Sequence, residues 1–289
     1  MIFDRHFSRR RFLTTSLALG TALQFPLRSE AAQSQDASLC KLSAEQEIGP
    51  YYLQDNLLRS DITEGKAGVP LILDIAIIDK RRCAPLANAI VDIWHCDARG
   101  VYSGFAKPSD SPPTMPPGPP PTGWGDPSHG GPTHDGLPPG PPPQSQPTDK
   151  LTFLRGIQRA DTRGNVTFRT IVPGLYMGRT NHIHFKVRMP DTSLAGEHVA
   201  HVGQVFFPED LMVRLMHTEP YRRNTIPRTT QSEDPVFMHQ HGDAAIARTI
   251  ALHDDAYEKG MRAQVVAVVD PDATPLPVGV GGPPEPRAS

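Results

Sequence analysis

The chain has 289 residues, of which 38% are hydrophobic and 21% are charged, and its formal net charge is −2. This composition allows a hydrophobic core in one or two domains, and so balanced a charge argues against a nucleic-acid partner. Three cysteines in this length exclude a disulfide-framework miniprotein. No run of 18 apolar residues follows the N-terminal region, so we do not expect the mature chain to span a membrane.

The first 31 residues have the features of an export signal. Residues 8–13 contain three consecutive arginines and are typical of a twin-arginine signal. An apolar stretch too short to cross a bilayer follows, and small residues around Ala31 favour cleavage after it. We therefore expect the mature protein to be periplasmic or extracellular, with a net charge of about −5.

An oxidising compartment favours one disulfide among the three cysteines. Cys40 precedes the first expected strand and Cys83 lies in a turn, so both occupy surface positions suited to a cross-link. Cys96 follows an apolar strand and is expected to be a buried free thiol. The sequence therefore predicts a Cys40–Cys83 disulfide.

Composition also divides the rest of the chain. Residues 106–150 contain 16 prolines and 7 glycines, too few core-forming residues to pack, and we expect a disordered insertion there. Residues 271–289 form a similar tail. The expected domain covers residues 32–270, interrupted by the insertion.

Within that domain the pattern is mainly that of short strands. Seven segments are expected to be strands: 69–79, 89–95, 152–160, 165–171, 182–189, 201–207 and 264–269. Residues 161–164 are expected to be a hairpin turn. Helical spacing occurs at 208–217, and 243–253 is a candidate second helix. The prediction is an all-β sandwich of mixed short strands, with one or two short helices and long loops.

The clearest chemical motif is His182-Ile183-His184. On a strand the two histidines point to the same face about 7 Å apart, which is close enough to bind one metal ion. Two exposed histidines on a solvated face would give the same pattern. A zinc or copper site completed by His201 is another alternative, whereas the glutamate that a cupin needs after the second histidine is missing.

Further motifs accompany this pair along the chain. They are Gly49-Pro50-Tyr51-Tyr52, the run from Trp94-His95 to Tyr102-Ser103, Phe153-Leu154-Arg155-Gly156, and the run from Pro173-Gly174 to Arg179. Together they resemble the intradiol ring-cleavage dioxygenases, which include catechol 1,2-dioxygenases and protocatechuate 3,4-dioxygenases, and most of all the exported single-chain members. The likeness runs from about Cys40 to Phe207, interrupted by the insertion.

The resemblance implies a ferric ion held by two tyrosinates and two histidines. The corresponding residues here are Tyr102, Tyr176, His182 and His184. A bound trivalent cation stabilises a deprotonated phenol strongly, although a free tyrosine has a pKa near 10. The family also implies that Tyr102 leaves the iron when substrate binds and helps to accept a proton. The insertion makes the distance along the chain between Tyr102 and Tyr176 longer than is usual in the family. The assignment of Tyr102 as a ligand therefore requires the insertion to be a surface loop that does not displace it.

The resemblance implies roles for four more residues. Arg179 would stabilise negative charge that develops on the substrate ring, while Pro50, Tyr51 and Gln204 would line or support the substrate pocket. The implied reaction is cleavage of a catechol by O₂ to a cis,cis-muconate-type diacid. The substituents of the catechol and the oligomeric state stay open. A non-catalytic β-sandwich module that binds through its proline-rich arm is a further alternative.

Overall fold

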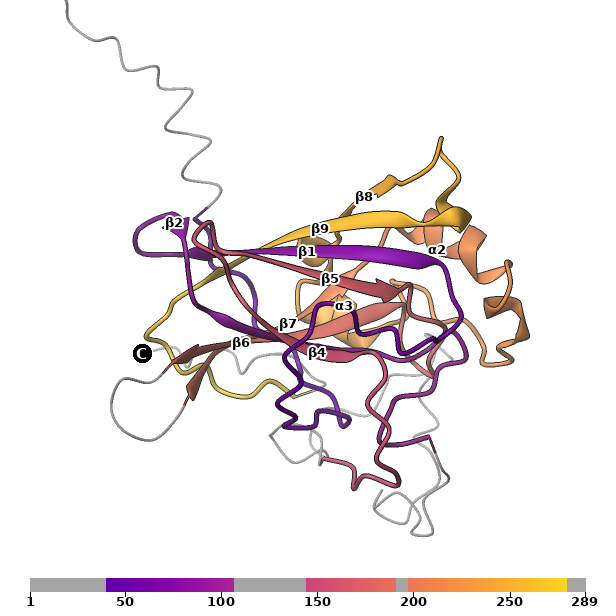
Figure 1. Ribbon diagram of the computed structural model, residues 1–289, viewed down its shortest axis with the longest axis horizontal. Helices are drawn as coiled ribbons and strands as arrows, with labels where there is room; N and C mark the ends of the chain where they lie inside the picture. Colours follow the sequence, from indigo (N-terminus) through magenta and orange to yellow (C-terminus); the bar gives the residue numbers. More distant parts are fainter. Residues whose placement is uncertain (1–39, 107–143, 191–196, 280–289) are drawn as a thin grey trace, which may run out of the picture.

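The computed structural model describes residues 40–106, 144–190 and 197–279 (Figure 1). The proposed signal segment, most of the proline-rich insertion and the end of the tail lie outside the described residues. Within the part that is described, no helix is both long and apolar enough to cross a bilayer.

The first of two sheets is built around a long central strand. Its members are β1 (Pro70–Asp79), β2 (Ala84–Pro85), β5 (Asn165–Ile171), β8 (Arg248–Ala251) and β9 (Met261–Val269). β1 pairs antiparallel with β5 and β2 along one edge and parallel with β9 along the other. β8 completes the order by pairing antiparallel with β9, so the sheet is mixed.

The second sheet is antiparallel throughout and has the order β4-β3-β6-β7. Its members are β3 (Ile90–Trp94), β4 (Arg155–Arg159), β6 (His182–Pro190) and β7 (Glu197–Phe206). Figure 1 shows the two sheets layered one over the other. The prediction of an all-β sandwich is confirmed.

The core lies between these sheets and follows from strand alternation. Every second side chain of β1 is buried, beginning with Leu71, and the core-facing side chains of β6 begin with Ile183. The helix α2 (Glu209–Met216) adds an apolar stripe to the same cluster. Each fully buried aliphatic side chain contributes roughly 1.5–3 kcal/mol of stabilisation.

Two local predictions were wrong. Residues 161–164 do not close a hairpin, because β4 pairs with β3 in the second sheet while β5 pairs with β1 in the first. The Asp161 side chain accepts hydrogen bonds from the backbone N–H groups of Arg163 and Asn165. These bonds stabilise the turn whether or not the two flanking strands pair with each other, so the sequence of the turn does not reveal the pairing. Residues 243–253 contain a 3₁₀ turn and β8 instead of a helix, since the free edge of β9 offers β8 a ladder of backbone hydrogen bonds.

The end of the proline-rich insertion is also different from the expectation of disorder. The Ser145 N–H donates to the Pro50 carbonyl at 2.9 Å, and the Thr148 N–H donates to the Gly104 carbonyl at 2.7 Å. Residues 144–150 are therefore fastened to the loops that carry Tyr51 and Tyr102. The expectation for residues 107–143 lies outside the described residues.

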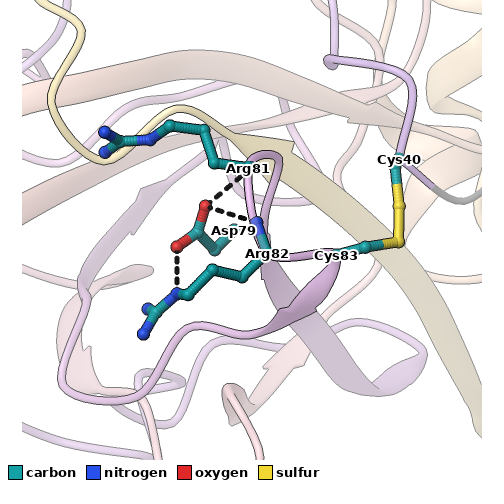
Figure 2. The surroundings of a disulfide bond; sticks show 5 residues. All are labelled: Cys40, Asp79, Arg81, Arg82 and Cys83. Atoms are coloured by element: carbon teal, nitrogen blue, oxygen red, sulfur yellow. Dashed lines mark hydrogen bonds and ion pairs between the residues drawn. A yellow bond between two sulfur atoms is a disulfide. The ribbon is translucent and has the colours of Figure 1, made fainter.

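A disulfide joins Cys40 to Cys83, with their Cα atoms 5.5 Å apart (Figure 2). Asp79 shapes the turn that presents Cys83. Its Oδ1 accepts the backbone N–H groups of Arg81 and Arg82, and its Oδ2 accepts the Arg82 side chain. The bridge pairs the two cysteines that the sequence pairs, and Cys96 is a buried free thiol, as predicted.

We expect replacement of both Cys40 and Cys83 by alanine to lower the free energy of unfolding by about 4 kcal/mol, because a separation of 43 residues places a long loop of the unfolded chain under constraint. Urea unfolding followed by circular dichroism measures the loss. A reducing agent should destabilise the parent to the same extent and leave the double variant unchanged. An equal effect of the reductant on both proteins would contradict the assignment.

Candidate metal centre

The candidate site lies on the face of the second sheet that points away from the core. On β6, Ile183 faces the core, so His182 and His184 face the other way. Both histidines are only 3% exposed, because the irregular chain before β1 covers this face. Its Gln46 N–H donates to the Val202 carbonyl of β7 at 2.9 Å. The alternative of two solvated histidines is thus ruled out.

The ring of His182 has one nitrogen free to bind a metal. Its Nδ1 lies 2.6 Å from the Thr180 carbonyl oxygen. That oxygen only accepts, so Nδ1 carries the proton and Nε2 presents a lone pair. The same Nε2 lies 3.3 Å from the Tyr102 hydroxyl and 3.1 Å from Nε2 of His184. Burial, followed by the charge of Arg179, lowers the pKa of His182 well below its usual value, which favours a neutral ligand.

His184 is held between an aromatic ring and a glycine backbone. The rings of Trp94 and His184 stack with their centroids 5.0 Å apart and an interplanar angle of 4°. Gly49, with φ of +69°, approaches the imidazole so closely that a Cβ there would lie 2.9 Å from its Cε1. Burial lowers the pKa of His184 as well. The position of this ring is therefore set by packing on both sides.

Tyr102 and Tyr176 complete the cluster from two different loops. Their rings meet edge to face with centroids 5.5 Å apart. Tyr51 stacks on Tyr102 at 4.7 Å, and its hydroxyl lies 2.9 Å from that of Tyr176. Burial raises the pKa of both Tyr102 and Tyr176, so each phenol ionises only when a cation compensates it.

The donor set fits a hard, highly charged metal ion. Two ligands that bind one ion at right angles lie about 3 Å apart, and the Nε2 atoms of His182 and His184 have that separation, at 3.1 Å. The described residues contain no group of three or more His, Cys, Asp or Glu able to hold a metal. Tyr102 and Tyr176 lie beside the two imidazoles and could provide further oxygen ligands, and phenolate oxygens suit a hard cation.

Arg179 is fixed beside the cluster by several partners. Its Nε donates to both carboxylate oxygens of Asp234, at 2.9 and 3.0 Å, and its Nη2 donates to Oε1 of Gln204. Its Nη1 lies 3.5 Å from Glu47. Burial raises the pKa of Glu47 in spite of this nearby cation. The position of the Arg179 guanidinium is therefore fixed, and most of its N–H groups are directed at other side chains of the protein.

The remaining expected site residues lie in the same region. Gln204 is fully buried on β7, and its amide nitrogen donates to the Glu47 carbonyl at 2.9 Å. Pro50 and Tyr51 form the loop over Tyr102, with the Pro50 carbonyl accepting from the end of the insertion. The structure thus brings all the expected residues of the resemblance together, and Gln204 acts there as a partner of Arg179.

The sequence reasoning missed two carboxylates of this region, Glu47 and Asp234. Asp234 also accepts the Thr180 N–H and caps the helix α3 (Pro235–His239). It lies 55 residues from Arg179 along the chain, so no local pattern connects the two residues. Glu47 could have been found, because it lies only two residues before Gly49 of the Gly49-Pro50 motif.

His201 does not belong to the site. On β7 it is paired opposite Val187, a core-facing residue of β6, and its ring lies 5.4 Å from that of Phe185. Its Nδ1 contacts Glu45 at 2.5 Å. The alternative of a three-histidine zinc or copper site is therefore wrong. Strand alternation places the imidazole of His201 on the core face of the second sheet, opposite to the face of His182 and His184.

We expect Gly49→Ala to destabilise the protein more than Gly65→Ala. Both glycines have positive φ, but a Cβ at Gly65 meets nothing within 4 Å, whereas one at Gly49 meets His184. Overpacking costs about 1–3 kcal/mol beyond the shared backbone strain. Equal free energies of unfolding for the two variants would show that the His184 ring moves away without cost.

Asp234→Ala should lower the free energy of unfolding by about 3–5 kcal/mol, because it leaves the buried Arg179 charge without its main partner. Asp243→Ala, at an exposed aspartate, is the control and should have little effect. Adding Arg179→Met to Asp234→Ala should recover part of the loss, as measured in a double-mutant cycle. Strict additivity in that cycle would contradict the coupling.

Comparison with solved structures identifies similar proteins. An intradiol ring-cleavage dioxygenase from Tetranychus urticae has 28% identity and a TM-score of 0.64, with 83% of this chain and 100% of that chain covered. A second dioxygenase structure has 28% identity and a TM-score of 0.62, covering 82% and 98%. Neither a protein-family model nor a curated protein matches the chain. In fold and in sequence, this protein is therefore similar to intradiol ring-cleavage dioxygenases.

Proposed function

We propose that the protein is a non-heme Fe(III) enzyme that uses O₂ to cleave a catechol between its two hydroxyl-bearing carbons, giving a cis,cis-muconate-type diacid. One observation carries the proposal: two tyrosine hydroxyls and two imidazoles converge in a buried cluster beside a fixed arginine. The similarity to a protein described as an intradiol ring-cleavage dioxygenase supports the reaction class.

In this proposal His182 and His184 bind iron as neutral imidazoles, and Tyr102 and Tyr176 bind it as phenolates. Ferric iron would supply the Lewis acidity and electron transfer that make a catecholate ring reactive toward O₂. The two phenolates would balance most of its charge and favour the ferric over the ferrous state. The Thr180 carbonyl supports this arrangement by keeping the proton of His182 on Nδ1.

The surroundings of the two tyrosines favour different roles for them. The Tyr51 hydroxyl lies 2.9 Å from that of Tyr176 and can donate a hydrogen bond to a phenolate there. Among the described residues Tyr102 has no such donor, since its hydroxyl contacts only Nε2 of His182. Tyr102 is therefore the better group to accept a proton from the incoming catechol.

Arg179 would stabilise negative charge on the bound substrate ring. Because Asp234 and Gln204 hold the guanidinium, no side chain needs to reorganise as that charge develops. Pro50 and Tyr51 would form the wall of the substrate pocket on the side of the loop that covers Tyr102. In this arrangement Glu47, Asp234 and Gln204 act through Arg179 and not on the substrate.

The proposal includes export by the twin-arginine route to the periplasm or the cell exterior. The Cys40–Cys83 disulfide supports it, because such bonds persist in oxidising compartments. A route that carries folded proteins would also suit an enzyme that acquires its metal before export.

The visible spectrum and the iron content of the purified protein test the proposal. We expect a tyrosinate-to-iron charge-transfer band that shifts on anaerobic addition of catechol. Tyr102→Phe and Tyr176→Phe should each change the band and lower kcat for catechol-dependent O₂ uptake by about 100-fold or more. Tyr257→Phe, outside the cluster, is the matched control.

Two results would overturn the assignment. The first is a protein that stays colourless after reconstitution with ferric iron. The second is O₂ uptake that is indifferent to loss of the Tyr176 hydroxyl.

A further inference from the structure

A cavity of about 820 Å³ lies beside the candidate metal centre and is lined by other residues. It is on the same outer face of the second sheet, farther along β6. Its apolar wall includes Ile48, Val199, Val202, Leu276, Pro277 and Val278. The volume is within the range of small-molecule binding sites. We name it the Lys186 cavity, after the one cation among the described residues that line it.

The wall formed by the C-terminal chain is anchored at both ends. After β9 the chain leaves the first sheet and runs beneath the second (yellow in Figure 1). The Pro271 carbonyl contacts Nε2 of His198 at 2.7 Å, and the Gly279 carbonyl accepts from the Gln240 amide at 2.8 Å. The cavity is therefore bounded by fixed chain on this side.

Lys186 is buried and makes no ion pair with a described carboxylate, although the charge of Asp92 nearby acts against the effect of burial on its pKa. Lys186 is only 6% exposed, and its Nζ lies 3.5 Å from the centre of the Tyr52 ring. No described residue accepts a hydrogen bond from this ammonium. A cation–π contact contributes about 0.5–2 kcal/mol, less than the several kcal/mol that burial of an ion costs. The ammonium thus has an unmet demand for a hydrogen-bond acceptor at the cavity.

The neighbouring carboxylates are committed elsewhere. Asp92, opposite Lys186 on β3, accepts two bonds from Arg188 at Oδ1 and one from the Tyr52 hydroxyl at Oδ2. Glu45, which also lines the cavity, accepts from His201 at one oxygen and from a backbone N–H at the other. Neither carboxylate therefore accepts a hydrogen bond from Lys186, and its ammonium can still donate to an external anion.

We propose that the Lys186 cavity binds a small organic monocarboxylate with an apolar body. The carboxylate would pair with the Lys186 ammonium, and the body would lie against the aliphatic wall. One ammonium as the single cation among the described residues of the lining suits one negative charge better than two. None of the four candidate metal ligands lines the cavity, so this site does not depend on the proposed catalytic function.

Isothermal titration of the full metal-loaded protein with 4-phenylbutyrate tests the proposal, with the neutral 4-phenylbutanol as the matched probe. We expect the carboxylate to bind and the alcohol to bind much more weakly. Lys186→Met should weaken carboxylate binding by about 10- to 100-fold, the value of a charge-assisted hydrogen bond. Lys186→Arg should retain most of it, and Lys80→Met, at an exposed lysine, should leave it unchanged.

A second variant guards against a folding defect caused by changing a buried strand residue. Leu276 lines the cavity but is 74% exposed, so Leu276→Glu should preserve the fold and repel the carboxylate. Tyr102→Phe should bind 4-phenylbutyrate as the parent does. Loss of binding in Tyr102→Phe would place the carboxylate at the metal centre and overturn the proposal. Unchanged binding in Lys186→Met, or equal binding of the alcohol, would overturn it too.

Discussion

The arrangement of this protein depends on one strand, β6, whose two faces are both buried. Its core-facing side chains are apolar, while the opposite face carries two histidines, a lysine and an arginine. Buried polar groups are costly unless they are paired. Partners come from the loop before β6, where the Thr180 carbonyl lies against His182, and from the neighbouring strand β3, where Asp92 accepts from Arg188. The result is a rigid polar layer outside the sandwich.

The Arg179 cluster connects this layer to the rest of the molecule. Arg179 precedes β6, Gln204 lies on β7, Glu47 precedes β1, and Asp234 starts α3. Four segments far apart in the sequence thus meet around one guanidinium. Such an ion pair adds little net stability compared with an apolar replacement, but its partial loss is expensive. Its main effect is to fix the position of a positive charge beside the histidines.

The same layer contains two regions with different electrostatic demands. At the candidate metal centre, neutral imidazoles and phenols offer a cluster of lone pairs that a cation would satisfy. Two residues after His184 on the same face of β6, the ammonium of Lys186 lacks a hydrogen-bond acceptor that an anion would provide. The ring of Tyr52 contacts both Trp94 and Lys186 and so separates the two regions. A single face can therefore offer a cation site and an anion site a short distance apart.

The sequence by itself determined the features that depend on local period and chemistry. Alternation on β6 placed His182 and His184 on one face, and the turn around Cys83 exposed that thiol for pairing with Cys40. Only the tertiary structure decided which sheet a strand joins and which distant groups meet. The turn at 161–164 is locally the same in a hairpin and in a crossing between sheets. Asp234 looks like an ordinary helix cap until Arg179 is placed beside it. His201 lies behind the sheet because β7 pairs in a register that no local pattern specifies.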